Sequence, residues 1–242
     1  MIGLEVCVDD ARGLRAAQQA GVARVELCSA LALGGLTPDC GLMRLAASLP
    51  VPAYAMIRPR AGDFLFDDDE EAMMLADIAA ARAAGLAGVV LGASRADFTL
   101  DTAMLARLSA ACGPMGRTLH RAFDLVPDPA QALEVAVELG FARILTSGGA
   151  PTAMEGAEGL RRVAAAASGR IEIMAGSGVN PANVAALVRR TGVGAVHGSC
   201  RGPARPSPAA VVSLGFGAER ITADSGVVRA MVDALETCRN GP

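Results

Sequence analysis

The sequence has no tryptophan, one tyrosine and six phenylalanines among its 242 residues. The core must therefore be aliphatic, and aromatic platforms on which nucleic-acid bases could stack are not expected. Long basic runs are also lacking, and the formal net charge is −3. Because a phosphate backbone is bound mainly through Lys and Arg, we expect no nucleic-acid partner.

Long apolar runs and paired cysteines are missing as well. No stretch approaches the roughly 18 uninterrupted apolar residues of a membrane span, and the opening residues, MIGLEVCVDD, lack the basic start of a signal peptide. The six cysteines include no CxxC pair, so neither a zinc ribbon nor a secreted disulfide scaffold is indicated. We predict a cytoplasmic protein without a membrane partner. The sequence leaves open whether it forms a homo-oligomer.

The chain repeats one phrase, in which a helical pattern ends at glycine and a short apolar run follows. The four copies are AGVARVEL, AGLAGVVL, LGFARILT and TGVGAVHG. Glycine supplies the left-handed backbone that ends a helix, and the runs that follow are typical of buried parallel strands. With four further runs they predict eight strands, at 2–8, 24–28, 53–57, 88–91, 117–119, 143–145, 171–175 and 195–197. Helical patterns lie between them, for instance at 10–20, 70–84, 101–112, 129–139 and 181–190.

Eight such alternations predict an α/β protein with one domain, a (β/α)8 TIM barrel over residues 1–242. The length is close to the roughly 250 residues typical of that fold. The competing fold, an open doubly wound sheet, would carry a glycine fingerprint after its first strand, where this chain has Cys7-Val8-Asp9-Asp10. A loop is expected at about 202–222, followed by a terminal helix at 227–238.

Two strands carry glutamate and cysteine in the same arrangement. The segments LEVC and VELC place the two residue types two positions apart, on one face of a strand. Glu5 with Cys7, and Glu26 with Cys28, should therefore face the lumen of the barrel. A buried carboxylate needs a cationic partner, and a structural ion pair is as consistent with this pattern as a functional site.

Arginines near strand ends are the candidate partners and the candidate anion donors. Arg58 or Arg121 could neutralise the buried glutamates. Arg58 and Arg60 flank Pro59 in an extended segment, so both can point the same way and clamp one oxyanion. The alternative is that they only neutralise the glutamates and Asp63.

Histidines and a glycine turn complete the predicted rim, which in such barrels carries the chemistry. The only two histidines, His120 and His197, both fall at strand ends, which favours acid–base or ligand roles. The turn Gly176-Ser177-Gly178 precedes a helix and suits an anion, although any tight turn needs glycine. Two cysteines and a nearby methionine favour Cu(I) in principle, but the same residues are common in cores.

Several segments together resemble the CutC family. They are LEVCVDD, ARVELCSALALGGLTPDCG, MIRPRAGDF, TLHRAFD, ELGFARILTSGG, and IMAGSGV with AVHGS, spread over about four-fifths of the chain. The resemblance implies a cytoplasmic (β/α)8 barrel linked to copper tolerance, with Cys7 and Cys28 as the copper-binding sulfurs. It also implies rim residues at Glu5, Glu26, Arg58, Arg60, Asp63, His120, Arg121, Asp124, Ser147 and His197. After Ser199 the chain departs from the family pattern, because that region is short and rich in Pro and Ala.

Three functions fit this sequence. The first is copper homeostasis, with Cu(I) bound between Cys7 and Cys28. The second is an enzyme acting on a small anionic substrate, for example a phosphorylated one. In that enzyme His120 or Glu26 moves a proton and Asp124 or Asp63 orients a partner. The anion would be held by Arg58, Arg60, Arg121, Ser147, His197 and the turn at Gly176 and Gly178, beside Glu5. The third is a non-catalytic sensor that uses the same pocket.

Overall fold

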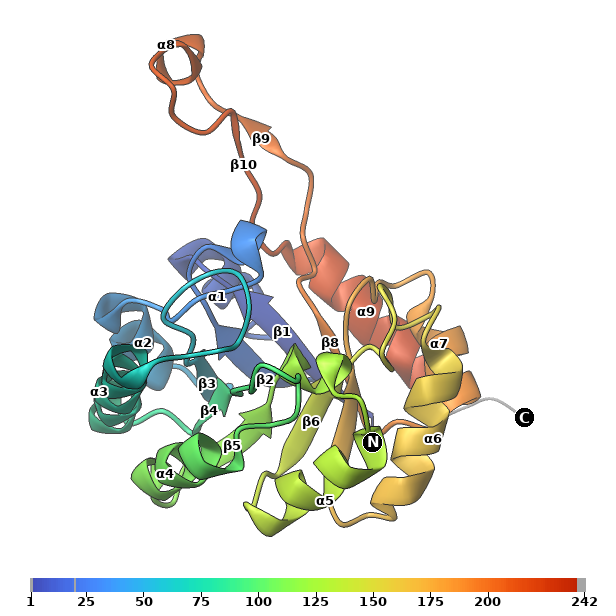
Figure 1. The fold of residues 1–242 in the computed structure, drawn as a ribbon. Coiled ribbons are helices and arrows are strands. Elements are labelled where there is room, and N and C mark those ends of the chain that lie inside the picture. Colours follow the sequence, from blue (N-terminus) through green and yellow to red (C-terminus); the bar gives the residue numbers. More distant parts are fainter. Residues whose placement is uncertain (1, 20, 239–242) are drawn as a thin grey trace.

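The protein is described by a computed structural model that covers residues 2–19 and 21–238. Eight parallel strands form a closed barrel in chain order, with β8 paired to β1 (Figure 1). The predicted (β/α)8 barrel is confirmed, and each predicted strand end lies within two residues of the observed one. The strands are β1 (Gly3–Val8), β2 (Val22–Leu27), β3 (Ala53–Met56), β4 (Gly88–Leu91), β5 (Gly116–Leu119), β6 (Arg143–Thr146), β7 (Glu172–Ala175) and β8 (Ala195–Gly198).

Helices follow the strands, and all of them except the one at Ala209–Ser213 lie around the barrel (Figure 1). They are α1 (Ala11–Ala16), α2 (Cys40–Ala47), α3 (Asp68–Ala84), α4 (Thr102–Cys112), α5 (Pro129–Glu138), α6 (Ala157–Ala167), α7 (Val184–Thr191), α8 (Ala209–Ser213) and α9 (Ser225–Thr237), with 3-10 turns η1 (Leu31–Leu33) and η2 (Arg121–Leu125). Six begin after an aspartate whose carboxylate accepts a backbone N–H of the first turn. Residue 20, the predicted end of the first helix, lies outside the described residues.

The alternation of side chains along β1 and β2 separates two cores. Leu4, Val6 and Leu27 have no exposed surface and belong to the aliphatic core between barrel and helices, whereas Glu5 and Cys7 face the lumen. Tyr54 fills part of the lumen, because a Cβ atom at either Gly88 or Gly116 would overlap its ring.

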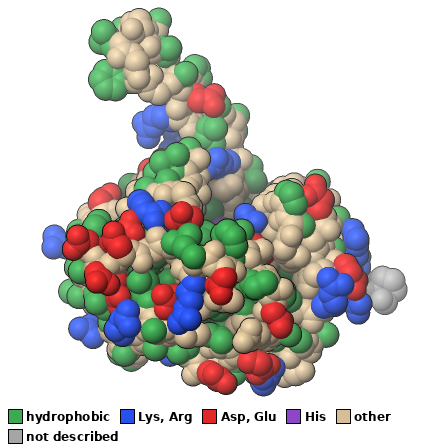
Figure 2. Space-filling model, viewed as in Figure 1, with side chains coloured by type: hydrophobic (Ala, Val, Ile, Leu, Met, Phe, Trp, Pro, Cys, Tyr) green, Lys and Arg blue, Asp and Glu red, His purple; other side chains and the backbone are tan. Residues whose placement is uncertain are grey.

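The segment predicted as a loop, 202–222, projects from the barrel as an arm (Figure 1). Its shaft is a two-stranded antiparallel ribbon, β9 (Arg205–Pro206) and β10 (Glu219–Arg220), and α8 lies between them. Apolar side chains gather at the tip (Figure 2), where Leu214 and Phe216 are exposed. In the part of the chain that the structure describes, no helix has both the length and the apolar character needed to cross a membrane.

The loop after β6 approaches α6 so closely that only glycine fits between them. A Cβ on Gly159 would overlap the carbonyl oxygen of Gly148, whereas a Cβ on Gly194 would meet nothing closer than 3.8 Å. We therefore expect Gly159→Ala to lower the free energy of unfolding by about 1–3 kcal/mol, since the backbone must move. Gly194→Ala is the matched control and should change it little. Urea unfolding of both variants measures the difference, and equal stabilities would contradict the close approach.

Candidate functional site

Glu5 is buried in the lumen and is held by two cations. Its carboxylate accepts a hydrogen bond from Arg24 Nε at 3.1 Å and lies 2.8 Å from His197 Nδ1. Burial alone would raise the pKa of Glu5, but the hydrogen bond and charge of His197, together with Arg24, hold it below its ordinary value. The prediction that Arg58 or Arg121 would neutralise Glu5 is therefore wrong, because its partners are Arg24 and His197.

The pairing extends across the floor of the lumen. Arg24 also reaches Glu172 on β7 at 3.4 Å, and Glu172 pairs with Arg143 on β6 at 3.0 Å. Arg143 in turn donates to Thr118 on β5 at 3.2 Å. With Glu5 on β1 and His197 on β8, six strands are thereby joined by buried or half-buried polar side chains.

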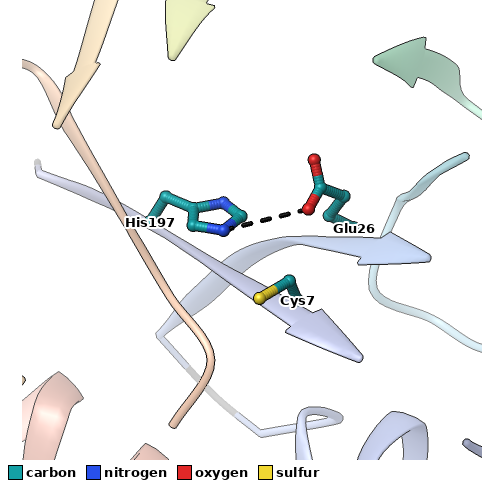
Figure 3. Close-up of side chains that lie close together, drawn as sticks. All are labelled: Cys7, Glu26 and His197. Atoms are coloured by element: carbon teal, nitrogen blue, oxygen red, sulfur yellow. Dashed lines mark ion pairs between the residues drawn. The ribbon is translucent and has the colours of Figure 1, made fainter. Parts of the chain in front are cut away.

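A second layer of polar groups lies above this floor. Cys7, Glu26 and His197 come from β1, β2 and β8 and point toward one another (Figure 3). One ligating atom from each lies within 4.8 Å of the other two, and His197 Nε2 is 3.8 Å from Glu26 Oε2. Burial would lower the pKa of His197, but the neighbouring Cys7, Glu26 and Glu5 raise it well above its ordinary value. Burial raises the pKa of Glu26 to about 7.

These groups open into a pocket of about 290 Å³ at the mouth of the barrel. Of the predicted site residues, the pocket is lined by Cys7, Glu26, Arg58, His120, Arg121, Gly178 and His197. Leu31, Gly34, Met56, Phe64, Leu145, Ser177, Val179, Gly198, Ser199 and Arg201 complete the lining. The strand-end prediction therefore brings seven of its residues to one cavity.

Arg58 and His120 are fixed on one wall of this pocket by Phe64. The Arg58 guanidinium lies 5.0 Å from the centre of the Phe64 ring, and the ring centres of Phe64 and His120 are 4.6 Å apart. His120 Nδ1 accepts the backbone N–H of Ala122 at 3.2 Å. Burial, together with the charge of Arg58, lowers the pKa of His120 to about 3, so its ring is neutral near pH 7.

Cys28 is not one of the three clustered residues Cys7, Glu26 and His197, although its thiol contacts Glu26. In the register of β1 with β2, Cys7 lies level with Glu26 rather than with Cys28. The Cys28 thiol is buried beside Tyr54 and Met56 and donates to Glu26 at 3.5 Å. Burial and the charge of Glu26 raise the pKa of Cys28 well above its ordinary value. The expectation that the two cysteines sit at matching heights is therefore wrong.

Arg60 and Asp63 lie outside the lining of the pocket. Arg60 donates to Asp63 at 2.9 Å, pairs with Glu70 and stacks on Phe66. Arg58 instead donates to backbone carbonyls and lines the pocket. The prediction that the two arginines clamp one oxyanion is wrong, because their guanidinium groups have different surroundings.

Asp124 and Ser147 organise the loop after β6. Asp124 accepts hydrogen bonds from Thr146 Oγ1, Gly149 N–H and both the N–H and the hydroxyl of Ser147. It also pairs with Arg121 at 2.7 Å. With so many donors already on its oxygens, Asp124 holds Arg121 in place and does not itself line the mouth pocket. It lines a separate cavity of about 460 Å³ between α5 and α6.

Two further predicted residues lie next to the pocket, and sequence analysis missed one residue of the buried pairing. Glu5 has no exposed surface and lies beneath the lining. Gly176 packs on Leu145, whose Cδ1 atom would be 2.5 Å from an added Cβ. Sequence analysis missed Arg24, although it lies two residues before Glu26 on the same face of β2. That spacing was the available signal.

Comparisons with known proteins agree with the fold and cover most of the chain. A model described as the CutC family matches residues 2–202, ending where the arm begins. A CutC family protein of Sinorhizobium medicae is 58% identical over 96% of this chain and 96% of its own. One from Caulobacter vibrioides is 56% identical over 83% and 82%. A solved CutC structure from Streptococcus agalactiae, described as a candidate copper homeostasis protein, is 33% identical, covers 82% of this chain and 99% of its own, and has a TM-score of 0.79.

The pair Arg24–Glu5 should matter greatly to stability. Removing one partner of a buried ion pair leaves an uncompensated charge, so Arg24→Met should lower the free energy of unfolding by about 3–5 kcal/mol. The control is Arg161→Met, which removes an exposed pair with Glu158 and should give no measurable loss. Urea unfolding at pH 7 compares the two. If both variants lost a similar amount of unfolding free energy, the stabilising role assigned to the pair Arg24–Glu5 would be contradicted.

The neutral state of His120 predicts a pH dependence of folding. Its pKa is about 3 in the folded protein and 6.5 ordinarily, so between these values the unfolded chain binds a proton that the native state does not. Because of His120, the free energy of unfolding should therefore decrease by about 1.4 kcal/mol for each unit by which the pH falls. The variant His120→Phe should lack this contribution, so its free energy of unfolding should decrease less steeply between pH 6 and pH 4, by about 1.4 kcal/mol per pH unit. Unchanged slopes in urea titrations at several pH values would show that His120 is protonated in the fold.

Proposed function

The chain belongs to the CutC family, and from this premise we propose that its barrel mouth binds a small anionic molecule and moves a proton on it. In this proposal Glu26 is the group that takes and returns the proton. Arg58 and His120 hold the molecule by hydrogen bonds. Arg121 adds positive charge at the rim.

One observation supports this proposal most directly. Among the described residues, Glu26 Oε1, Arg58 Nε and His120 Nε2 are all buried without a hydrogen-bond partner. All three side chains line the same pocket. Leaving a buried polar atom unsatisfied costs about 1–3 kcal/mol, so three such atoms around one cavity are the arrangement expected where a ligand supplies the missing partners.

The electrostatics favour an acid–base role for Glu26. A carboxyl group transfers protons best when its pKa is near the working pH, and burial raises the pKa of Glu26 to about 7. His197 lies close enough to stabilise its charged form. The arginine on the facing wall favours a ligand of negative charge. The six free cysteines support the cytoplasmic location that we include in this proposal.

Copper is the second candidate, and the cluster of Cys7, Glu26 and His197 favours it. The Streptococcus agalactiae relative is named for copper homeostasis, and a thiol with an imidazole suits Cu(I). A site here would use Cys7 with His197, and Glu26 as a weaker oxygen ligand. Cys28 fits less well, because its buried thiol resists the deprotonation that a metal ligand needs. Both candidates use Glu26 and His197.

Thermal unfolding with added anions tests the proposal. Phosphate, glycolate and pyruvate are the probes, each at millimolar concentration. A probe that binds should raise Tm by about 2–4 °C once it exceeds its Kd about fivefold. Arg58→Ala should abolish that rise, whereas Cys7→Ser should keep it.

Cu(I) binding in competition with a chelator, without oxygen, is the second arm. The acid–base proposal is wrong if no anion shifts the wild type while Cu(I) binds one to one and Cys7→Ser abolishes that binding. Such a result would establish the copper candidate instead.

A further inference from the structure

We infer that Arg58 Nε–H and His120 Nε2–H form an oxyanion hole, and that the substrate is a small carbonyl compound from which Glu26 removes a proton next to the carbonyl. This inference rests on the proposed function and deepens it by naming the reaction class. It depends on which atoms of the two side chains already have partners.

The His120 ring faces the pocket with a donor rather than an acceptor. Its Nδ1 atom accepts the backbone N–H of Ala122, so in the neutral ring the proton is carried by Nε2. Nε2 is the atom without a partner. A neutral imidazole gives up this proton very reluctantly. It therefore stabilises an oxygen by hydrogen bonding, without transferring a proton to it.

Most of the N–H groups of Arg58 already donate to backbone carbonyls. Its Nη1 atom donates to the carbonyl oxygens of Leu33 and Gly35 at 3.1 and 3.2 Å, and its Nη2 atom donates to that of Gly62 at 2.7 Å. Nη2 makes this one hydrogen bond with its two N–H groups. Nε is the only nitrogen of Arg58 that is buried with no hydrogen bond at all. Together, the Nε–H of Arg58 and the Nε2–H of His120 suit one oxygen atom.

The two donors are held rigidly beside each other. Both side chains pack on Phe64, and a Cβ at Gly92 would lie only 2.5 Å from the His120 ring. The backbone carbonyls that hold Arg58 come from η1 and from the loop after β3. Donors fixed in advance are those that stabilise developing charge most effectively.

The chemistry is complete with the groups present. Glu26 Oε1 takes a proton from the carbon next to the carbonyl, and the electron pair of that C–H bond forms a carbon–carbon double bond. The π electron pair of the carbonyl moves to its oxygen, where the N–H groups of Arg58 and His120 stabilise the negative charge. Return of the proton to the same carbon gives exchange with solvent. In a hydroxycarbonyl, the proton of the neighbouring hydroxyl group can pass to the enolate oxygen, and return of the proton held by Glu26 to the former carbonyl carbon then gives an isomer. No oxidant, reductant or second substrate is required.

Arg201 indicates where a charged end of the substrate would lie. It lines the mouth of the pocket, is exposed and forms no salt bridge among the described residues. Ser177, Gly178 and Ser199 line the same pocket. The substrate class is thus a small carbonyl compound that also carries an anionic group.

Proton exchange in D2O, followed by ¹H NMR, tests the inference. The probes are pyruvate, hydroxypyruvate and dihydroxyacetone phosphate, each compared with its rate without protein. At least one should exchange faster with the wild type, and Glu26→Gln should abolish the acceleration. His120→Phe should lower it about 10²-fold, the usual effect of losing one oxyanion donor. His120→Gln can still offer an N–H and should retain most of the rate, and Arg58→Lys, which has no Nε–H, should lower it as His120→Phe does.

Binding of oxalate, a planar mimic of the pyruvate enolate, separates this inference from the proposed function. The wild type and Glu26→Gln should both bind oxalate more tightly than pyruvate, and His120→Phe should lose that preference. If anions still stabilise the protein through Arg58 but no probe exchanges faster, the enolate chemistry is wrong and the anion site stands. If the wild type binds no anion, the proposed function fails as well. Tm values of all variants show whether a loss reflects unfolding.

Discussion

Glu5 carries its charge in the lumen with no exposed surface, and much of the arrangement around it follows from the need to compensate that charge. Burying an unpaired carboxylate is expensive, so Arg24 and His197 are drawn to its two oxygens. Arg24 then brings Glu172 into the lumen, and Glu172 brings Arg143. The barrel is therefore filled on this side by a chain of opposite charges, where many barrels use layers of branched aliphatic side chains.

The same pairing sets the orientation of the functional layer. Because His197 Nδ1 is committed to Glu5, its Nε2 atom must face Glu26 and Cys7 (Figure 3). The imidazole thus connects the carboxylate of Glu5 with that of Glu26. Glu5 has two cations and a lowered pKa, whereas Glu26 has only the imidazole of His197, 3.8 Å away, and a raised pKa. Two glutamates from equivalent sequence positions acquire different chemistry from their surroundings alone.

The fold could be predicted from sequence because its signals are local. A glycine that ends a helix and the short apolar run that follows it can both be recognised within a few residues of sequence, as at Gly85. The positions of Glu26, His120 and His197 in one pocket followed from strand ends. The partners of charged side chains did not, because they depend on tilt and register. The register of β1 with β2 places Cys7 level with Glu26 and not with Cys28, and Arg60, which follows Pro59, pairs with Glu70. Neither is encoded in spacing.

The charge state of His197 bears on which ligand the site can hold. In the structure its two nitrogens face two carboxylates, and its pKa lies well above the ordinary value. A copper ion at Nε2 would have to displace the proton on that atom, so metal binding would compete with the pairing between His197 and Glu26. A small anion held at Arg58 and His120 makes no such demand, because it binds on the wall built around Phe64. The protonated imidazole is then free to stabilise Glu26 as a carboxylate between proton transfers. The electrostatics of the lumen therefore favour the organic anion over the metal as the ligand of this state of the barrel.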